Sequence, residues 1–479
     1  MSLKLPDKGQ WAFIGLVMCL VTYYTGSVAV YFLNGKTPLY IWKNFDSMLL
    51  WRIITESNIR TDIRLTAIPS LLSGMVSSLI VPVFIIWQLN KTDVALYGDA
   101  KFASDNDLRK SKLLKWEKEN DTDILVGAYK GKYLWYTAPD FVSLGAGTRA
   151  GKGAAIGIPN LLVRKHSLIA LDPKQELWKI TSKVREILLG NKVYLLDPFN
   201  SKTHQFNPLF YIDLKAESGA KDLLKLIEIL FPSYGMTGAE AHFNNLAGQY
   251  WTGLAKLLHF FINYEPSWLN EFGLKPVFSI GSVVDLYSNI DRELILSKRG
   301  ELEGTNGLDE NALYHLRDAL TKIREYHETE DEQRSSIDGS FRKKMSLFYL
   351  PTVRKCTDGN DFDLRQLRRE DITVYVGVNA EDISLAYDFL NLFFNFVVEV
   401  TLRENPDFDP TLKHDCLMFL DEFPSIGYMP IIKKGSGYIA GFKLKLLTIY
   451  QNISQLNEIY GIEGAKTLIG SFSVGGYTG

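Results

Sequence analysis

Short apolar runs of strand length recur in two separate parts of the chain. They lie at 141–144, 168–171 and 193–196, and again at 372–378, 416–420 and 444–449. Amphipathic or apolar stretches of helical length separate them, at 154–165, 176–189 and 387–402. Strands that alternate with helices predict a parallel, doubly wound sheet, so we expect one α/β domain built from both parts.

The segment between these two parts has a different periodicity. From 213 to 350, apolar residues such as Leu223, Ile227 and Leu230 recur at helical spacing, and strand signals are few. This pattern predicts an all-helical domain inserted into the α/β domain. The expected division is an N-terminal anchor, the first α/β part, the helical insertion and the second α/β part, at residues 1–92, 93–212, 213–352 and 353–479.

Two uncharged segments precede the α/β part. Residues 11–33 and 68–89 contain no Asp, Glu, Lys or Arg. Each is long enough to cross a bilayer of about 30 Å as a helix. A signal peptide is the alternative for the first segment, but its apolar run is too long for one. We therefore expect a two-helix transmembrane anchor, whose orientation the flanking Lys and Arg residues leave undecided.

Length and composition describe a foldable chain of several domains. The 479 residues exceed what one hydrophobic core usually holds. With 46% hydrophobic residues, 23% charged residues and a net charge of −2, the chain is neither disordered nor basic overall. A nucleic-acid site must therefore be a local patch. The three cysteines follow no metal-ligand spacing and are expected to be packing residues.

A glycine-rich segment follows the first predicted strand. In FVSLGAGTRAGKG, residues 141–153, glycines surround Lys152. The pattern approximates the P-loop, G-x-x-x-x-G-K-[ST], whose backbone N–H groups hold nucleotide phosphates while the lysine reaches the β- and γ-phosphates. Ala146 replaces the first glycine, and Gly153 replaces the hydroxyl residue that binds magnesium. The motif alone supports nucleotide binding and an ordinary glycine-rich turn about equally.

If the segment is a P-loop, the residues that bind ATP are those between the strand and the helix. They are Gly147, Thr148, Arg149, Ala150, Gly151, Lys152 and Gly153.

A P-loop site also needs a carboxylate from a neighbouring strand to hold Mg²⁺ and a group that orients the attacking water. Three predicted strands end in aspartate, at Asp172, Asp197 and Asp421, and only Asp421 is followed by a second acid, Glu422. We expect Asp421 to ligate Mg²⁺ and Glu422 to polarise the water, with an ordinary acidic turn as the alternative. Thr148 is a second candidate metal ligand, and Asp421 is preferred.

Gln451 ends the strand that follows the two acids. A strand-end glutamine can sense the γ-phosphate or position water, so the expected catalytic residues are Lys152, Glu422 and Gln451.

Several stretches together resemble the type IV coupling proteins, the ATPases of bacterial conjugation and type IV secretion. They are Tyr97–Ala103, Thr148–Gly153 with Ile158–Leu162, Leu171–Lys174, Asn207–Leu209, Leu420–Phe423 with Gly427, and Gln451 with Gln455–Leu456. The family's loop also tends to carry Gly after the lysine and to tolerate Ala at the first position. Both departures from the general P-loop are therefore expected of a member.

The resemblance implies a RecA-like P-loop NTPase that works as a homo-hexameric ring in the bacterial inner membrane, multi-pass, with most of the chain cytoplasmic. Its cofactors would be ATP and Mg²⁺. Its partners would be a relaxase–DNA complex or effector proteins, together with components of the type IV secretion channel. An arginine finger from a neighbouring subunit is often expected, but near Gln451 the chain offers only Lys443 and Lys445. Lys445 is the weak candidate for this role.

The chain ends at residues 471–479, SFSVGGYTG, which match none of the strands that the family resemblance leads us to expect. We interpret this ending as a truncation or an altered reading frame that would remove support from the sheet.

A DNA motor needs basic groups that contact phosphates. The best local cluster is Arg342, Lys343 and Lys344, although a solvated helix face explains it equally well. Beside a DNA-stimulated coupling ATPase, two alternatives stay open. One is a membrane-anchored docking receptor that uses nucleotide as a structural switch, and the other is a septal DNA translocase.

Overall fold

The computed structural model describes residues 8–56, 104–111, 113–138, 141–147, 151–234, 236–430 and 439–478, with single positions 61, 65, 69, 72, 76 and 432. The chain divides into two compact units, Met1–Ala103 and Ser104–Gly479.

The first unit contains three described helices, α1 (Lys8–Leu33), α2 (Pro38–Asn44) and α3 (Leu49–Thr55). Val30 of α1 and Ile53 of α3 are buried together, with Leu49 packed against them. The Tyr31 hydroxyl group donates a hydrogen bond to the backbone oxygen of Asn44 at 2.9 Å. These contacts fold the two short helices back against the end of α1.

The predicted membrane anchor is not found. Helix α1 covers the first uncharged segment, 11–33, but most of the second segment, 68–89, lies outside the described residues. Among the residues described, no helix combines the length and the apolar character needed to cross a bilayer. This finding contradicts the predicted multi-pass inner-membrane localisation. The prediction relied on the length and the lack of charge of the two segments, whereas residues 22–27 in the middle of α1 are TYYTGS and interrupt its apolar run.

A small antiparallel sheet opens the second unit. Helix α5 (Asp105–Lys110) is capped by Ser104 and leads to β1 (Leu114–Lys115), β2 (Ile124–Tyr129) and β3 (Lys132–Tyr136). The strand order is β1-β3-β2. The hairpin between β2 and β3 turns at Lys130 and Gly131, which both have positive φ.

The main sheet has seven strands in the order β10-β4-β9-β8-β5-β7-β6, and every neighbouring pair is parallel. Their bounds are β4 (Phe141–Ala146), β5 (Ser167–Leu171), β6 (Lys192–Leu196), β7 (Ile372–Val376), β8 (Cys416–Asp421), β9 (Leu444–Tyr450) and β10 (Phe472–Thr478). The α/β fold with a parallel sheet, predicted from the apolar runs, is confirmed.

Strand β10 corrects the prediction for the end of the chain. Residues Phe472–Thr478 pair with β4 in parallel, with a register shift between Phe472 and Val474. The segment is rich in glycine and lacks a strong apolar run, so its local pattern does not predict a strand. Residues 472–478 form a strand because they pair with the backbone groups of β4.

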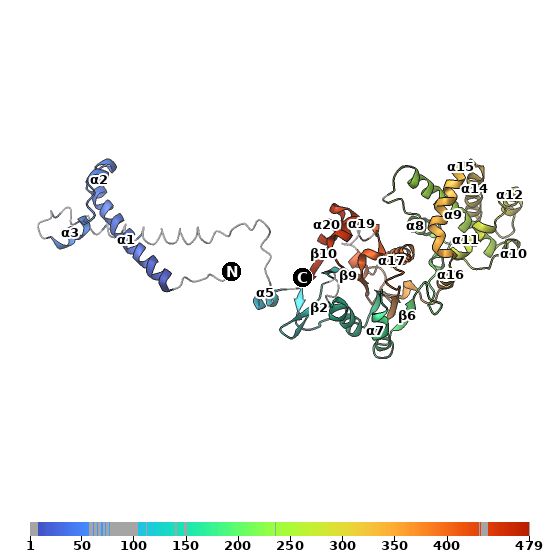
Figure 1. Cartoon of the computed structure of the whole chain (residues 1–479), viewed down its shortest axis with the longest axis horizontal. Coiled ribbons are helices and arrows are strands. Elements are labelled where there is room, and N and C mark those ends of the chain that lie inside the picture. Colours follow the sequence, from blue (N-terminus) through green and yellow to red (C-terminus); the bar gives the residue numbers. More distant parts are fainter. Residues whose placement is uncertain are drawn as a thin grey trace. The chain divides into compact units, whose positions relative to one another are not determined.

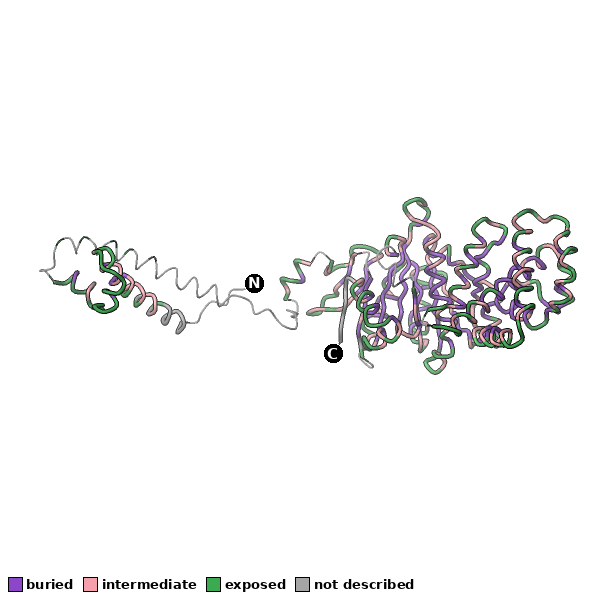
Figure 2. Tube along the Cα trace, turned by 90° about the horizontal axis from the view of Figure 1, so that it is seen from above, coloured by how far each residue is buried: buried purple, intermediate pink, exposed green. Residues whose placement is uncertain are grey.

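Helices cover both faces of the sheet. Leu168 and Ala170 of β5 belong to the hydrophobic cluster that contains Leu161 of α6 (Ile158–Val163) and Leu177 of α7 (Glu176–Ile187). Their neighbour Ile169 faces the opposite cluster. That cluster includes residues of α17 (Tyr387–Leu402), α19 (Ile453–Tyr460) and α20 (Ile462–Gly470). Figure 2 shows that the strands between these two layers are buried.

The chain between β6 and β7 forms the helices that gather at one end of the second unit (Figure 1). They are α8 (Gly219–Leu230), α9 (Gly238–Asn263), α10 (Ser267–Glu271), α11 (Ile280–Asn289), α12 (Arg292–Ser297), α13 (Arg299–Glu303), α14 (Glu310–Glu328), α15 (Asp331–Met345) and α16 (Pro351–Thr357). We call α8–α16 the helical insertion. Helix α9 lies at its centre, where Tyr250 stacks on Tyr326 of α14 with ring centroids 3.8 Å apart.

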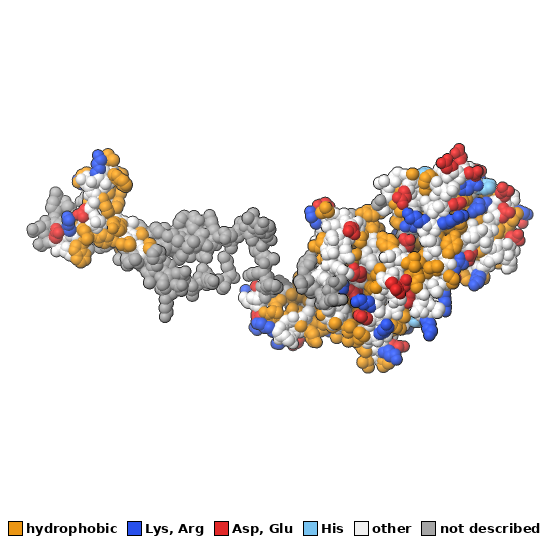
Figure 3. All heavy atoms as spheres, viewed as in Figure 1, with side chains coloured by type: hydrophobic (Ala, Val, Ile, Leu, Met, Phe, Trp, Pro, Cys, Tyr) orange, Lys and Arg blue, Asp and Glu red, His pale blue; other side chains and the backbone are white. Residues whose placement is uncertain are grey.

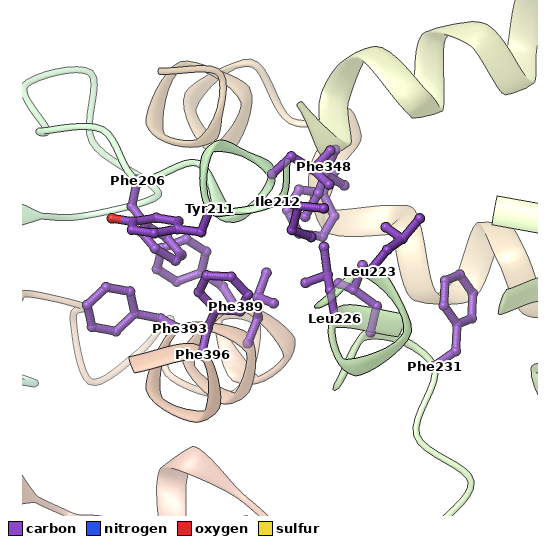
Figure 4. Close-up of a cluster of buried hydrophobic side chains, with 14 of the residues drawn as sticks. Phe206, Tyr211, Ile212, Leu223, Leu226, Phe231, Phe348, Phe389, Phe393 and Phe396 are labelled. Atoms are coloured by element: carbon purple, nitrogen blue, oxygen red, sulfur yellow. The ribbon is translucent and has the colours of Figure 1, made fainter. Parts of the chain in front are cut away.

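The helical insertion and the sheet share one continuous core. Figure 4 shows aromatic residues of α17, including Phe393, facing Phe206 and Tyr211, while Leu223 and Leu226 of α8 lie beside Phe348. The rings of Phe206 and Phe393 pack edge to face, with their centroids 4.9 Å apart. Because these residues belong to a single buried cluster, the helical insertion packs on the α/β part through apolar contacts.

Candidate functional site

The carboxyl ends of four neighbouring strands form the candidate site. Strands β4, β9, β8 and β5 lie side by side and parallel, so the residues that follow them meet at one edge of the sheet. These residues are Gly147, Gln451, Glu422 and Asp172, with Asp421 ending β8 itself. Residues that lie far apart in the sequence are brought together by this strand order.

Lys152 lies close to both acids of β8. Its Nζ atom is 3.8 Å from Oδ1 of Asp421 and 3.6 Å from Oε2 of Glu422. Gly151 has φ +72°, a left-handed conformation that glycine adopts without strain, and it turns the chain into the helix beyond. Thr148, Arg149 and Ala150 lie outside the described residues, so the middle of the expected loop is not described.

The helical turn after Lys152 packs directly on β8. The π-helical segment η1 (Gly153–Gly157) continues into α6. A Cβ atom on Gly157 would lie only 2.9 Å from the ring of Phe419. Because Gly157 has no side chain, the helix can lie close to Phe419, which is two residues before Asp421 in β8. This close packing holds Lys152, at the start of the helix, near the two acids.

Glu422 is held by two glutamines. Gln451 Nε2 donates to its Oε2 at 3.0 Å, and Gln455 Nε2 donates to its Oε1 at 3.3 Å. The backbone of Glu422 has φ +78° and ψ +53°, a strained conformation for a residue with a side chain. In this conformation the carboxylate lies within hydrogen-bonding distance of both glutamines.

Sequence reasoning had not assigned a site role to Gln455. This residue also accepts hydrogen bonds from the backbone N–H groups of Gln451 and Asn452, while Asn452 caps α19 in return. An Asn followed three residues later by Gln is a capping-box signature, which marks the start of a helix. That signal in the sequence could have placed Gln455 beside Gln451.

Asp421 has a buried oxygen without a donor. Its Oδ1 atom accepts no hydrogen bond within the described part of the chain. Burial raises the pKa of Asp421, although the charge of Lys152 opposes this shift. A divalent cation would satisfy the buried oxygen and favour the ionised carboxylate, so the environment of Asp421 fits Mg²⁺.

The other two strand-end aspartates differ in position. Asp172 follows β5, next to β8, and its Oδ2 accepts the backbone N–H of Trp178 at 2.8 Å. Burial raises the pKa of Asp172, and the charge of Asp421 adds to the effect. Asp197 follows the edge strand β6 and accepts a hydrogen bond from Gln175 at 2.8 Å. Asp172 therefore borders the site, whereas Asp197 does not.

The lysines considered for the finger role lie at the opposite edge of the sheet. Lys445 is at the amino end of β9, is 6% exposed, and donates to the backbone oxygens of Thr122 and Ala138. Lys443 donates to the backbone oxygen of Leu412 at 2.7 Å. Both side chains serve local structure, and neither is near Gln451.

The basic cluster on α15 does not form a single patch. Arg342 donates to the Tyr287 hydroxyl group at 3.3 Å, Lys343 lies 3.4 Å from Glu240, and Lys344 lies 3.6 Å from Asp388 of α17. Successive residues on a helix point about 100° apart, so the three side chains face different neighbours. Figure 3 shows Lys and Arg side chains over the helical insertion interspersed with acidic ones.

Comparison with known proteins identifies the family. The family model described as "Type IV secretory system Conjugative DNA transfer" matches residues 101–476. The chain is 24% identical over 485 residues to the conjugal transfer protein TraG of Escherichia coli, covering 95% of this chain and 73% of TraG. It is 28% identical over 347 residues to the VirD4 protein of Agrobacterium fabrum, covering 72% of this chain and 48% of VirD4.

Among solved structures, the plasmid coupling protein TrwB in complex with ADP and Mg²⁺ is 16% identical to this chain. The TM-score is 0.47, and the alignment covers 70% of this chain and 69% of TrwB. The chain spans about half of the length of VirD4 and about three quarters of that of TraG. Because the family match runs through the α/β part and the helical insertion alike, the chain belongs to the Type IV secretory system Conjugative DNA transfer family and is a type IV coupling protein.

Proposed function

We propose that this protein is a RecA-like ATPase that couples substrates to a type IV secretion or conjugation channel and uses ATP hydrolysis to drive their transfer. The substrates are relaxase-bound DNA, effector proteins or both. The observation that carries the proposal is the position of Lys152, within 4 Å of both Asp421 and Glu422. A lysine after a glycine-rich turn, facing two strand-end acids, is the arrangement that phosphoryl transfer from ATP requires.

Each of these residues has a distinct proposed role. Lys152 would leave its contacts with the acids and pair with the β- and γ-phosphates of ATP. Asp421, with Thr148 as a further ligand, would hold Mg²⁺, which neutralises charge on the phosphates. Glu422 would orient the attacking water and accept its proton, and Gln451 would hold the Glu422 carboxylate in place. Residues 147–153 would bind the phosphates through their backbone N–H groups.

The proposed active form is a homo-hexameric ring. A residue from the neighbouring subunit would complete the site, since Lys443 and Lys445 have other partners within their own subunit. Partners of the ring would be the relaxase–DNA complex or effector proteins and the components of the channel. Contact with DNA by Arg342, Lys343 and Lys344 would require separate surfaces, because these side chains point in different directions.

The test is ATP hydrolysis by the purified full chain, with and without single- and double-stranded DNA. We expect measurable turnover that DNA increases, and loss of turnover in Lys152→Ala and in Glu422→Gln. Glu422→Gln should still bind ATP, because the lost group acts on water. Lys179→Ala, at an exposed position of α7, is the matched control and should retain turnover.

Full hydrolysis by Lys152→Ala would contradict the proposed nucleotide site. Hydrolysis that depends on Lys152 but is insensitive to both forms of DNA would keep the ATPase and refute DNA stimulation. Substrate transfer in cells by the Lys152→Ala variant would refute the coupling of hydrolysis to transfer.

A further inference from the structure

A cavity in the helical insertion is lined by three arginines. Its volume is about 840 Å³, and the charged residues of its wall are Arg292, Arg334, Arg342 and Asp338. Arg334, Asp338 and Arg342 follow one another at intervals of four residues on α15, so they lie on one face of that helix. Arg292 begins α12. Three positive charges against one negative charge give the wall an excess of two positive charges.

Two of the three arginines have no acidic partner. The Nε atom of Arg292 donates to the Tyr250 hydroxyl group at 2.7 Å, and the Nε atom of Arg342 donates to the Tyr287 hydroxyl group at 3.3 Å. Neither guanidinium group forms an ion pair with any of the described residues. Because arginine keeps its charge in proteins, two positive charges at this cavity have no carboxylate within ion-pair distance.

The third arginine, Arg334, is only partly satisfied. Its Nη2 atom donates to Oδ1 of Asp331 at 2.9 Å, but the Asp331 side chain is 97% exposed, so solvent weakens this pair. The Nε atom of Arg334 is buried and has no hydrogen-bond partner in the part of the chain that the structure describes. A buried donor without a partner is costly, and an anion in the cavity could accept its hydrogen bond.

The aromatic side chains around the cavity hold its charged groups in place. Oδ1 of Asp338 accepts hydrogen bonds from the hydroxyl groups of Tyr287 at 2.8 Å and Tyr326 at 2.6 Å. The Tyr287 ring stacks on Phe341, with centroids 4.0 Å apart. The Tyr287 hydroxyl group thus donates to Asp338 and accepts from Arg342. Asp338 therefore orients the two tyrosines, one of which positions Arg342.

We propose that Arg292, Arg334 and Arg342 form a binding site for a phosphate group. A guanidinium group presents paired N–H donors that match the spacing of phosphate oxygens, which makes arginine well suited to this ligand. A smaller cavity of about 390 Å³ shares Arg334, Asp338 and Arg342 with the first, so the basic wall extends beyond the space of one phosphate. The phosphate group can belong to a nucleic-acid strand or to a free nucleotide.

This site differs from the basic cluster that the sequence suggested. Of Arg342, Lys343 and Lys344, only Arg342 lines the cavity, and its companions are arginines from α12 and from eight residues earlier on α15. The site contains none of the residues proposed to act on ATP. It therefore stands or fails independently of the proposed function.

The test measures the affinity of the full chain for two probes. Binding of a fluorescein-labelled single-stranded oligonucleotide is followed by anisotropy at several salt concentrations. Binding of inorganic pyrophosphate is followed by calorimetry in a Lys152→Ala background, in which the proposed nucleotide site is impaired. Without a second phosphate site, pyrophosphate binding in this background should be insensitive to changes in the helical insertion.

Arg292→Gln and Arg342→Gln should each weaken binding by about tenfold. For the oligonucleotide, each lost phosphate contact should also lower the slope of log affinity against log salt by about 0.7. Asp338→Asn should strengthen binding, because it removes the negative charge from the wall while an amide oxygen can still accept from the tyrosines. Arg324→Gln, at an exposed position of α14 outside the cavity wall, removes the same charge and should bind as the parent chain does.

Circular dichroism establishes that the variants are folded. A loss confined to the oligonucleotide assigns the site to a nucleic-acid strand, and a loss confined to pyrophosphate assigns it to a free phosphate compound. The proposal is overturned if folded Arg292→Gln and Arg342→Gln bind both probes with the affinity of their parent chains. It is equally overturned if Arg324→Gln weakens binding as much as they do, since the effect would then follow from net charge alone.

Discussion

Gln451 donates a hydrogen bond from Nε2 to Oε2 of Glu422 across 3.0 Å. The two residues follow neighbouring strands, β9 and β8, and lie 29 positions apart in the sequence. This bond restrains the carboxylate proposed to orient the attacking water. It makes Gln451 a positioning residue as well as a candidate sensor of the γ-phosphate.

Gln451→Ala should lower the rate of ATP hydrolysis and leave ATP affinity nearly unchanged. A hydrogen bond to a charged group contributes about 1.5–3 kcal/mol, which corresponds to a decrease of roughly 10- to 100-fold. The measurement is kcat and KM for ATP. Gln249→Ala, on the exposed side of α9, is the control. Unchanged kcat in Gln451→Ala would show that Glu422 does not need this bond.

Asp421→Asn should raise the Mg²⁺ concentration needed for half-maximal hydrolysis by about tenfold or more, equal to about 1.4 kcal/mol of binding free energy. The reason is that the buried Oδ1 loses its negative charge, which is what attracts the cation. ATP binding in the absence of Mg²⁺, followed with a fluorescent analogue, should persist. Asp197→Asn, a strand-end change outside the site, should keep the wild-type Mg²⁺ dependence, and a similar shift in both variants would argue against Asp421 as the ligand.

Gly427→Ala should destabilise the protein. Gly427 has φ +82°, and an added Cβ atom would lie 2.2 Å from the Tyr387 hydroxyl oxygen. Backbone strain of this kind costs about 1–3 kcal/mol, and the close contact adds to it. Urea unfolding measures the loss. Gly441→Ala is the matched control, because a Cβ atom at Gly441 meets no atom within 4 Å.

Tyr234 and Tyr428 connect the helical insertion to the chain that follows the two acids. Their rings stack with centroids 3.5 Å apart and an interplanar angle of 1°. A double-mutant cycle with Tyr234→Ala and Tyr428→Ala should give a coupling free energy of about 1 kcal/mol in unfolding experiments. Tyr133→Ala, at an exposed position of β3, combined with Tyr234→Ala should give additive effects. Additivity in the first pair would show that the stacking does not stabilise the fold.

Acid should destabilise the helical insertion through one buried histidine, His315, and one half-buried histidine, His259. Burial, followed by the charge of Lys215, lowers the pKa of His259 to about 4, and burial, followed by the charge of Lys256, lowers that of His315 to about 4. Between pH 6.5 and pH 4 the unfolded chain binds protons that the folded chain does not. The free energy of unfolding therefore falls as the pH decreases through this window, by about 3 kcal/mol for each histidine.

The measurement is urea unfolding between pH 8 and pH 4. His259→Gln and His315→Gln should each reduce the pH dependence, with the values at pH 8 serving as the reference for each variant. A pH profile that stays unchanged in the double variant would assign the acid sensitivity to other groups.

Local patterns predicted the elements of this fold well. The long helix expected at 387–402 is α17 at the same residues, and the apolar runs became β4–β9 with small changes in their bounds. These helices and strands follow from the periodicity of apolar residues within each segment, and tertiary contacts then stabilise them. The end of the chain was not predicted to be a strand, because β10 depends on its pairing with β4 and its own sequence pattern does not predict a strand. The membrane prediction is contradicted for the described residues, among which no helix is long and apolar enough to cross a bilayer, and α1 carries the polar stretch 22–27.

For the candidate site, the sequence by itself determined the residue types: a lysine in a glycine-rich turn, two adjacent acids after an apolar strand, and a glutamine after the next. Only the tertiary structure decided that Lys152, Glu422 and Gln451 meet, because their contacts depend on the order of strands in the sheet. The same strand order brings His166, Asp371 and His414 together, although their spacing in the sequence does not predict that they are neighbours. Strand order results from pairing between distant segments, so no local pattern carries it.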